Sequence, residues 1–356
     1  MLILNQVLLE ALKQVLIMTR HGTRTPMVGF PNDDSEWQCL QRHLYNFQHK
    51  NNPLSSKPAL KLVFDVKNNL KGPCFSGQLA DQGYQQNVFL SQLWEQLYES
   101  VYSNSSIRTT SIERVRLSLS GQLNNVNASI HNAHVANMFT DSTAVNWNCS
   151  WISTYKKYLY EHSTYHRQEL SALQHRCQLY DNWEGIGDDM KARIAMNVPF
   201  PSCLTLQEVN LAMQIQDDQF NLRYFTNPNI NQRTKFIQIT IGTYMNDLIN
   251  LIQNGTPFHI SSAHDTSVGP LAAVLIQGEF GQVGFSSFIN VEVWEENGKE
   301  LVKVRFRNGP KGEGKYMVQN ACGEVVCTKQ QVIYWLEKYR ISVKQREEMC
   351  RSQFVE

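Results

Sequence analysis

The chain has 356 residues, of which 42% are apolar, and a formal net charge of +1. This length is ample for one large hydrophobic core, or for a core with a smaller lobe. The near-zero charge argues against a general binder of nucleic acid or of acidic membranes. No window of the sequence is long and apolar enough to span a bilayer.

Strands and helices alternate in the first third of the chain. The apolar run QVLIM, residues 14–18, predicts a buried parallel strand. Apolar residues at helical spacing predict a helix within residues 77–101. The segment SSIRTT, residues 105–110, predicts a short strand and a turn. Ser111 is then a candidate cap for a helix that runs through Leu123.

The middle of the chain has a different character. Residues 125–234 are polar and aromatic, with helix-like pieces and little strand alternation, which predicts an inserted, mostly helical lobe. A strong amphipathic helix follows over residues 234–253, ended by Asn254 and Gly255. The two ranges together separate the first predicted strands from the strands near the end of the chain.

Strands return after residue 256. The segment PFHISSAHD, residues 257–265, predicts a strand that ends in a His-Asp pair, and Thr266 is a candidate cap for the next helix. Residues 288–309 predict a hairpin that turns at Asn297-Gly298. The hairpin would supply an antiparallel edge.

This order predicts an α/β fold with a doubly wound, mostly parallel sheet and helices on both faces. Residues 1–124 and 235–356 are expected to form the α/β core, and residues 125–234 a mainly helical cap lobe. Residues 31–76 lack clear periodicity and form an insertion near the predicted site.

The eight cysteines form no CxxC pair and no Cys/His zinc spacing. An even count without metal spacing favours disulfides, and thus an oxidising compartment, over free thiols in the cytosol. Asn-X-Ser/Thr sequons at Asn104, Asn127, Asn148 and Asn254 are compatible with secretion. The N-terminal residues lack the basic start and the cleavage site of a signal peptide, and no retention signal ends the chain.

Polar side chains follow three of the predicted strands. In an open α/β sheet, ligands bind beyond the carboxyl ends of the strands, so these side chains are expected to meet there. The set contains three arginines, two histidines and one carboxylate: Arg20, His21, Arg24, Arg108, His264 and Asp265.

This set of residue types fits phosphoryl transfer. Arginine is a permanently charged planar fork of donors, and three forks suit a dianion whose oxygens point in several directions. A neutral histidine can attack phosphorus, and an aspartic acid can protonate a leaving alkoxide. The sequence contains no P-loop, no GxSxG elbow and no carboxylate cluster arranged for two metals, so we expect neither a metal nor another cofactor.

Several motifs resemble those of the histidine acid phosphatases, a branch of the histidine phosphatase superfamily. RHGTRTP, residues 20–26, is similar to that family's RHGxRxP signature, and SAHDT, residues 262–266, is similar to its second signature. IRTTSIER, residues 107–114, resembles the family's middle motif. The stretches at residues 77–85 and 291–298 also fit, so the order of motifs agrees over nearly the whole chain.

The resemblance implies a role for each site residue. His21 would be the nucleophile that becomes phosphohistidine, and Asp265 would donate the proton to the leaving group. Arg20, Arg24 and Arg108 would hold the phosphate, and His264 would add a further contact. Thr23, Thr109 and Ser111 depart from common family residues without touching these six. The substrate implied is a small phosphomonoester, and homodimers are frequent in that family.

A weaker resemblance concerns the cysteines. Their spacing, with short local matches, is similar to the subgroup that includes the Golgi 2-phosphoxylose phosphatase. That subgroup would pair the cysteines as Cys39-Cys74, Cys149-Cys350, Cys177-Cys203 and Cys322-Cys327. It also implies a lysosomal, extracellular or other secretory-pathway location.

Alternative interpretations stay open for single residues. Arg114 and Arg116, on the helix after the middle motif, are expected to be structural, and Glu113 and Glu292 are expected to form salt bridges. The other histidines are assigned to the surface or the core: His43, His49, His131, His134, His162, His166, His175 and His259. Four tryptophans in the inserted regions are assigned to packing, with an apolar wall for the leaving group as the alternative: Trp37, Trp147, Trp151 and Trp183.

Three alternatives remain for the protein as a whole. It could be a catalytically idle relative that binds phosphorylated sugars or lipids. It could also be a phosphatase of the same family specialised for sugar phosphates or for lysophosphatidic acid. The third alternative, a phytase, needs a strongly basic pocket. Neither residues 31–76 nor residues 125–234 contain a dense run of lysine and arginine, which disfavours a phytase.

Overall fold

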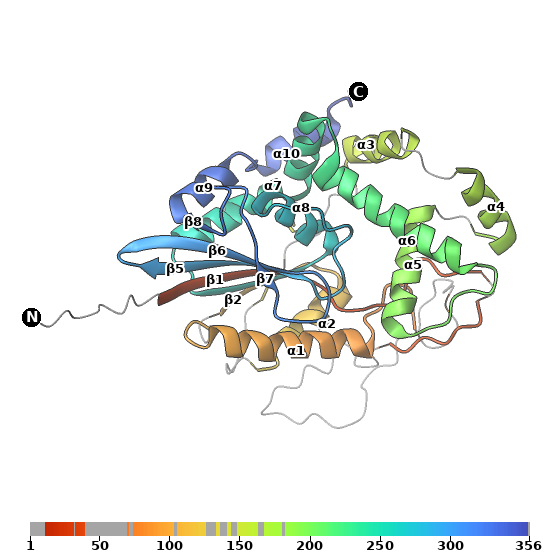
Figure 1. Ribbon diagram of the computed structural model, residues 1–356, viewed down its shortest axis with the longest axis horizontal. Helices are drawn as coiled ribbons and strands as arrows, with labels where there is room; N and C mark the ends of the chain where they lie inside the picture. Colours follow the sequence, from red (N-terminus) through yellow and green to blue (C-terminus); the bar gives the residue numbers. More distant parts are fainter. Residues whose placement is uncertain are drawn as a thin grey trace, which may run out of the picture.

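The computed structural model describes residues 11–31, 33–39, 70, 74–102, 105–125, 133–135, 141–143, 148–162, 167–179 and 182–354. Figure 1 shows a twisted sheet with helices on both of its faces and a group of further helices beside it. The arrangement confirms the predicted α/β fold. No helix in the described part of the chain is long and apolar enough to cross a membrane.

The sheet is mixed. Its order is β3-β2-β4-β1-β5-β6-β7, and β8 pairs with β6. The first four strands in this order are mutually parallel, whereas β5 to β8 join through antiparallel pairs. The strands are β1 (Ala11–Arg20), β2 (Ser105–Thr109), β3 (Ala133–Val135), β4 (Phe258–Ala263), β5 (Phe288–Glu296), β6 (Lys299–Arg307), β7 (Lys315–Tyr316) and β8 (Val326–Thr328).

The hairpin forms where the sequence predicted it. Strands β5 and β6 are joined at Asn297 and Gly298, whose φ angles are 52° and 72°. Two successive positive φ angles make the tight turn whose twist matches that of the two strands. The antiparallel part is larger than expected, because β7 and β8 both pair with β6.

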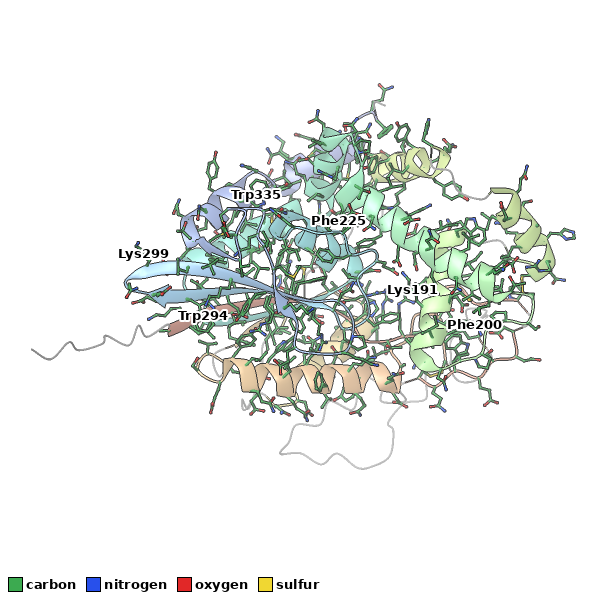
Figure 2. The ribbon with its side chains drawn as sticks, in the orientation of Figure 1. Lys191, Phe200, Phe225, Trp294, Lys299 and Trp335 are labelled. Atoms are coloured by element: carbon green, nitrogen blue, oxygen red, sulfur yellow. A yellow bond between two sulfur atoms is a disulfide. The ribbon has the colours of Figure 1, made fainter. Side chains whose placement is uncertain are left out.

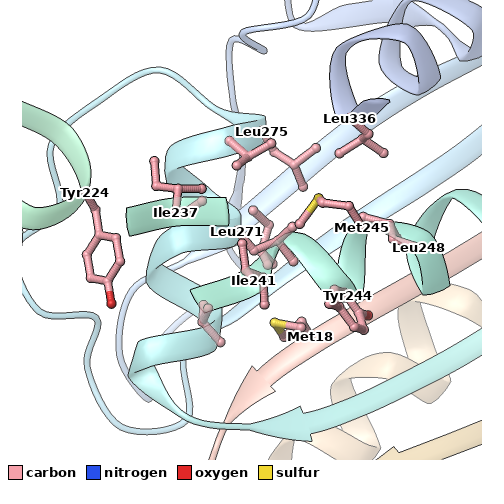
Figure 3. Packing of buried hydrophobic residues seen from close by; sticks show 14 of the residues in the cluster. Met18, Tyr224, Ile237, Ile241, Tyr244, Met245, Leu248, Leu271, Leu275 and Leu336 are labelled. Atoms are coloured by element: carbon pink, nitrogen blue, oxygen red, sulfur yellow. The ribbon is translucent and has the colours of Figure 1, made fainter. Parts of the chain in front are cut away.

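The central strand β1 separates two hydrophobic cores, because successive side chains of a strand point to opposite faces. Leu16 and Met18 pack on one face against α7 and α8, and Figure 3 shows Met18 beneath Tyr244 and Ile241. Val15 and Ile17 pack on the other face against α1. Burial on both faces explains why the sequence of β1 is continuously apolar.

The first four helices of the sheet layer lie close to the predicted ranges, and the last two were not predicted. They are α1 (Asp81–Tyr98), α2 (Glu113–Gln122), α7 (Ile230–Gln253), α8 (Asp265–Leu275), α9 (Lys329–Glu337) and α10 (Val343–Arg351). The predicted caps Ser111 and Thr266 are wrong. The N-cap residues are Ile112 and His264, and neither makes a side-chain cap hydrogen bond. At the start of α8, the side chain of Asp265 makes a hydrogen bond instead: its Oδ1 accepts from the Thr266 N–H at 2.8 Å.

The remaining helices form the group beside the sheet in Figure 1. They are α3 (Ser150–Glu161), α4 (Arg167–Cys177), α5 (Trp183–Met196), α6 (Leu206–Asn221) and the π-helical turn η2 (Leu222–Thr226). Helices α4 to α6 share a hydrophobic cluster of their own, which includes Trp183, Met190 and Ile215. Strand β3 lies within the range predicted for the lobe but pairs with β2 in the sheet. The division into a core and a cap lobe stays a prediction.

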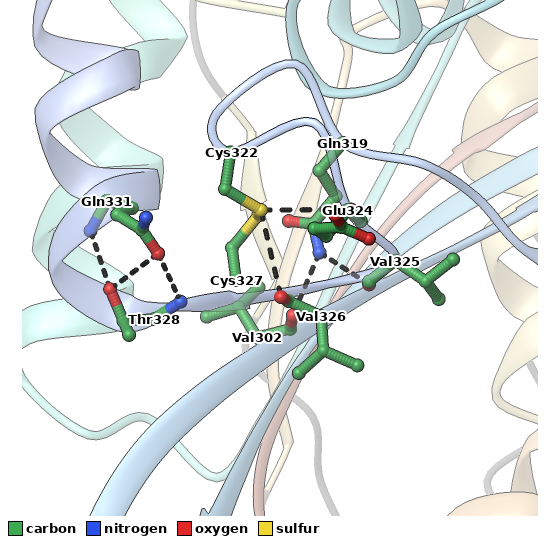
Figure 4. Close-up of a disulfide and its surroundings, with 9 residues drawn as sticks. All are labelled: Val302, Gln319, Cys322, Glu324, Val325, Val326, Cys327, Thr328 and Gln331. Atoms are coloured by element: carbon green, nitrogen blue, oxygen red, sulfur yellow. Dashed lines mark hydrogen bonds between the residues drawn. A yellow bond between two sulfur atoms is a disulfide. The ribbon is translucent and has the colours of Figure 1, made fainter.

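All eight cysteines are paired, as Cys39–Cys74, Cys149–Cys350, Cys177–Cys203 and Cys322–Cys327. These are the pairs that the subgroup resemblance implies. Figure 4 shows the last pair, which closes a short loop beside Gln319 and Val302. Of the predicted insertion, Trp37, Cys39, Leu70 and Cys74 pack against Ala192 of α5; most of residues 40–73 lie outside the described residues.

Two of the four sequons can be located. The side chains of Asn148 and Asn254 are exposed, so both could accept a glycan. Asn104 and Asn127 lie outside the described residues. Glycosylation therefore stays a prediction for all four positions.

A buried arginine ties the segment after the nucleophile motif to α5. The Arg193 guanidinium bonds Asp189 Oδ1 at 2.5 Å, the carboxylate of Asp33, the hydroxyl of Ser35 and the Pro199 carbonyl. Burial raises the pKa of Asp189 to about 7, even though Arg193 opposes this shift. The ion pairs therefore lie in an environment where unpaired charge is costly.

We predict that Arg193→Met lowers the free energy of unfolding by about 3 kcal/mol, because it leaves two largely buried carboxylates without their cation. Denaturant titration of the folded protein measures this loss. The control is Arg340→Met, which removes an exposed pair with Glu337 and should cost less than about 0.5 kcal/mol. Equal losses for the two variants would contradict a central role for the Arg193 network.

Candidate active site

Three strands end at one edge of the sheet, as the sequence predicted. Arg20 of β1 lies opposite Ala263 of β4, and Thr109 of β2 lies opposite Ser262. The His21 N–H donates to the Ala263 carbonyl at 3.1 Å, which ties the two signature segments together directly. The site is therefore built where parallel strands end and where their chains turn into helices.

Close backbone contact holds the nucleophile segment against α1. A Cβ atom at Gly22 would lie 2.1 Å from the Gly83 carbonyl oxygen, and one at Gly83 would lie 2.1 Å from the Thr23 carbonyl oxygen. Both positions thus require glycine for steric reasons rather than for a special φ angle. The Gly22 N–H also donates to Ser118 Oγ of α2 at 3.1 Å.

His21 is buried and neutral. Burial and the charge of Arg114 hold the pKa of the imidazole well below its usual range. Nδ1 lies 2.9 Å from the Gly22 carbonyl, which can only accept, so Nδ1 carries the proton. The lone pair is therefore on Nε2, which accepts a hydrogen bond from Arg114 Nε at 3.2 Å. A neutral imidazole keeps this lone pair unprotonated and is a competent nucleophile.

Arg20 and Arg24 flank the same space. Arg20 contacts Asp265 Oδ2 at 3.3 Å and donates to the Val283 carbonyl. Arg24 is held by α5 through Asp188, at 2.8 and 3.0 Å. Both guanidinium groups face the Phe285 ring, at 4.3 and 5.7 Å from its centre. The Nε atom of each arginine is buried without a hydrogen-bond partner in the described part of the chain, so donors remain for an anion.

The predicted position of Arg108 is wrong. Its guanidinium bonds Asp247 of α7 at 2.7 Å and Asp141 at 3.4 Å, away from His21. The cause is strand alternation: Ile107 packs in the core on the α1 face, so its neighbour Arg108 faces α7. Arg108, one residue before the end of β2, is therefore paired with carboxylates on the α7 face of the sheet.

Arg114 takes the place expected of Arg108, which corrects its assignment as a structural residue. It lies in the first turn of α2, and the helix begins at the same sheet edge as the nucleophile segment. Burial, followed by the charge of Arg24, lowers the pKa of Arg114 to about 9. The sequence did contain a signal for this position of Arg114. The residue belongs to the middle motif and lies at the N-terminus of a helix that begins where the strands end.

His264 and Asp265 complete the cluster. The ring centres of His264 and His21 are 5.6 Å apart, and His264 Nε2 lies 3.2 Å from the hydroxyl of Thr110. Burial and the charge of Arg114 lower the pKa of His264. Burial would raise the pKa of Asp265, but the charges of Arg20 and Arg24 outweigh it and lower that pKa. The empty site thus holds an ionised carboxylate beside a neutral histidine.

Residues of the helical group and of the segment that precedes β5 also lie beside the site. Gln282 donates to Asp265 Oδ2 at 2.6 Å, and Lys191 contacts Gln282 Oε1 at 3.3 Å and Asp217 at 2.6 Å. Figure 2 shows Lys191 between the helical group and the sheet. Sequence reasoning missed Asp188, Lys191 and Gln282, because nothing local in the sequence relates them to strand ends far along the chain.

Other candidates lie elsewhere. Glu292 is buried and bonds Tyr98, Tyr316 and Arg305. The predicted salt bridge of Glu292 is thus present. His259 is buried between strands, as expected of a core histidine. The other histidines that the structure describes, His134, His162 and His175, are exposed. Trp37, Trp151 and Trp183 are buried in cores, whereas Trp147 lies outside the described residues. In the ranges that the structure describes, no three His, Cys, Asp or Glu side chains gather as metal ligands.

Part of the sequence is similar to a known group of proteins. Residues 11–124 match the model of the histidine phosphatase superfamily, branch 2. This part of the chain is similar to that superfamily. It contains the nucleophile motif and the middle motif, and the similarity supports phosphatase activity.

Solved structures share the fold. A phytase from Citrobacter braakii is 13% identical and aligns over 95% of this chain and 99% of its own, with a TM-score of 0.58. A Hafnia alvei phytase in complex with myo-inositol hexakis sulphate is 12% identical over 94% of this chain and 98% of its own, with a TM-score of 0.61. Counting factor 60 of Dictyostelium discoideum is 23% identical over 366 residues, which cover 89% of this chain and 83% of that protein.

The assignment of Arg114, rather than Arg108, as the third arginine of the site can be tested directly. We predict that Arg114→Met lowers kcat/KM for a simple phosphomonoester by about a hundredfold or more, because it removes a donor aimed at developing charge. Arg108→Met should keep kcat/KM within about threefold and lower stability, since it only unpairs Asp247 and Asp141. Steady-state kinetics and thermal melting of both variants measure this; the reverse ranking in kcat/KM would restore the sequence-based assignment.

Proposed function

We propose that the protein is an acid phosphatase that hydrolyses phosphate monoesters through a phosphohistidine intermediate. The observation that carries the proposal is the neutral His21, whose Nε2 accepts a hydrogen bond from Arg114 and whose pKa is lowered also by the charges of Arg20 and Arg24. Two of these arginines have unused buried Nε donors in the described structure. Such a site attracts a dianion and presents it to a nucleophile at the same time.

The reaction proceeds in two balanced steps. In the first, His21 Nε2 attacks phosphorus, the bond from phosphorus to the ester oxygen breaks, and Asp265 gives its proton to the leaving alkoxide. In the second, Asp265 takes a proton from water while the water oxygen attacks phosphorus and the bond to Nε2 breaks. Arg20, Arg24 and Arg114 hold the phosphoryl oxygens, and His264 adds a contact. Arginine supplies the charge stabilisation, so the cycle is proposed to need no metal or other cofactor.

Acid conditions favour this cycle. Arg20 and Arg24 lower the pKa of Asp265 in the empty site, which leaves it ionised near neutral pH. A bound dianion pulls that pKa upward again, because it cancels the positive charge around the carboxyl group. The protonated form therefore exists with substrate bound, and its share falls as the pH rises. We expect kcat/KM to fall from acid toward neutral pH for substrates that need a proton on the leaving group.

The substrate class is a small phosphomonoester. The cations beside the site are largely matched by carboxylates, with Arg223 on Glu184, Lys191 on Asp217 and Arg24 on Asp188. This balance supports sugar phosphates, of the 2-phosphoxylose type, or lysophosphatidic acid over a polyanion such as phytate. A panel of phosphomonoesters assayed at pH 5 separates these, and a protein that binds them without turnover would be the idle relative.

The disulfides bear on location. Four of them, joining all eight cysteines, fit an oxidising compartment, so we place the protein in the secretory pathway, a lysosome or the extracellular space. Two exposed sequons support glycosylation in the same compartments. A homodimer is carried forward from the family resemblance alone and is checked by light scattering.

We predict that His21→Ala abolishes turnover of p-nitrophenyl phosphate and that EDTA leaves the wild-type rate unchanged. The alanine has no lone pair to attack phosphorus, and the arginine cluster needs no metal to hold the phosphate. A colour assay measures both. Rapid acid-free quenching with labelled substrate should also trap a phosphorylated chain in the wild type only. Turnover by the variant, or loss of activity on chelation, would end this mechanism.

Asp265→Asn tests the acid. We predict a loss of at least about a hundredfold in kcat with alkyl phosphates, whose leaving groups need a proton. With p-nitrophenyl phosphate, which leaves as a stable anion, the loss should be several times smaller. Paired kinetics on the two substrates give the comparison. Equal losses would show that Asp265 positions the phosphate rather than donating a proton.

A further inference from the structure

A carboxylate of the helical group reaches into the arginine cluster. Asp188 of α5 accepts two hydrogen bonds from Arg24, at 2.8 Å from Nη2 and 3.0 Å from Nη1. It also lies 3.5 Å from the Met27 backbone nitrogen, and its side chain is only 14% exposed. A partly buried, bidentate pair of this kind is strong and geometrically specific.

Asp188 therefore competes with phosphate for one guanidinium group. The two terminal nitrogens of Arg24 face the carboxylate, and Nη1 also donates to the Thr25 carbonyl. Arg24 Nε is the donor left without a partner in the described structure. An arriving dianion can use this remaining donor, or displace the carboxylate, but in either case it meets a negative charge beside its own.

Counting charges shows the effect. Arg20, Arg24 and Arg114 contribute three positive charges, and Asp188 and Asp265 contribute two negative ones, so the empty cluster has a net charge of one positive. A bound phosphate dianion makes the total one negative while Asp265 is ionised, and zero once Asp265 carries the proton that the proposed reaction gives it. Without Asp188, each of these totals would be more positive by one unit. In either protonation state of Asp265, the Asp188 carboxylate thus lowers by one unit the positive charge that holds the dianion.

Asp188 is not needed to anchor its helix. Arg193 of the same helix makes that attachment by pairing with Asp33, and Asp189 holds the Arg193 side chain within the helix. Trp183 and Met190 of the same helix are fully buried in the cluster shared by α4 to α6. The position of α5 is thus set by other contacts, which leaves the Asp188 charge free for a different role.

We propose that Asp188 is a counter-charge that weakens the hold of the arginine cluster on phosphate, so that product phosphate leaves the enzyme readily. It acts on the dianion through Arg24 and is a positioning residue that sets affinity. This inference rests on the proposed phosphatase function. It adds a residue of the helical group to the phosphate site, and it links release of product to a side chain far along the sequence from the nucleophile.

The test uses the full chain with inorganic phosphate as the probe. Asp188→Asn keeps the shape of the side chain and removes its charge. We expect it to bind phosphate about tenfold more tightly, by calorimetry and by product inhibition, since a unit charge a few ångströms from a dianion is worth about that factor. KM and kcat for p-nitrophenyl phosphate should fall together, because release of phosphate becomes slow.

Two further variants separate charge from structure. Asp188→Glu keeps the charge and should keep the wild-type affinity for phosphate. Asp218→Asn, an equal change of charge at an exposed position of α6, should alter that affinity less than twofold. Weaker or unchanged phosphate binding by Asp188→Asn would overturn the proposal. So would a loss of the melting transition in Asp188→Asn, because it would show a structural role. Wild-type protein that neither hydrolyses nor binds phosphate would instead contradict the proposed function itself.

Discussion

Three guanidinium groups packed around one neutral imidazole are the interaction on which the rest of this structure depends. Bringing like charges together out of water is unfavourable, and the lowered pKa of Arg114 is one sign of that cost. Each arginine is therefore held by a different partner: Arg20 by Asp265, Arg24 by Asp188, and Arg114 by the imidazole. The Phe285 ring adds a face of negative potential to two of them.

The same repulsion explains why the nucleophile is neutral. A protonated His21 would add a fourth positive charge, so burial and the arginines together keep the lone pair unprotonated. The Gly22 carbonyl then selects the tautomer by accepting the Nδ1 proton. Gly22 and Gly83 allow the main chain to come close enough to α1 for this geometry. Fold and chemistry are linked here by backbone contact and not only by the reacting side chains.

The sequence predicted the elements that interactions between residues close in the chain determine. Alternation and helical spacing predicted β1, α1, α7 and the hairpin, because burial on one or both faces leaves a periodic trace. It also predicted that the strands before His21 and before His264 end together. It failed at Arg108, since which face of β2 a residue occupies depends on the register of the neighbouring strand, and it failed at the helix caps. Asp188 was beyond reach because its contact with Arg24 joins residues more than 160 positions apart.

The proposed reaction asks Asp265 to donate a proton in a site that lowers the pKa of its carboxyl group. Arg20 lies 3.3 Å from its carboxylate, and Gln282 donates to the same oxygen, so both stabilise the ionised form while the site is empty. A phosphate dianion changes the balance, because the arginines then turn toward a better partner and the carboxylate faces new negative charge. The proton is therefore taken up with the substrate rather than before it. This coupling lets the arginine cluster attract the dianion without permanently disabling the acid that completes the reaction.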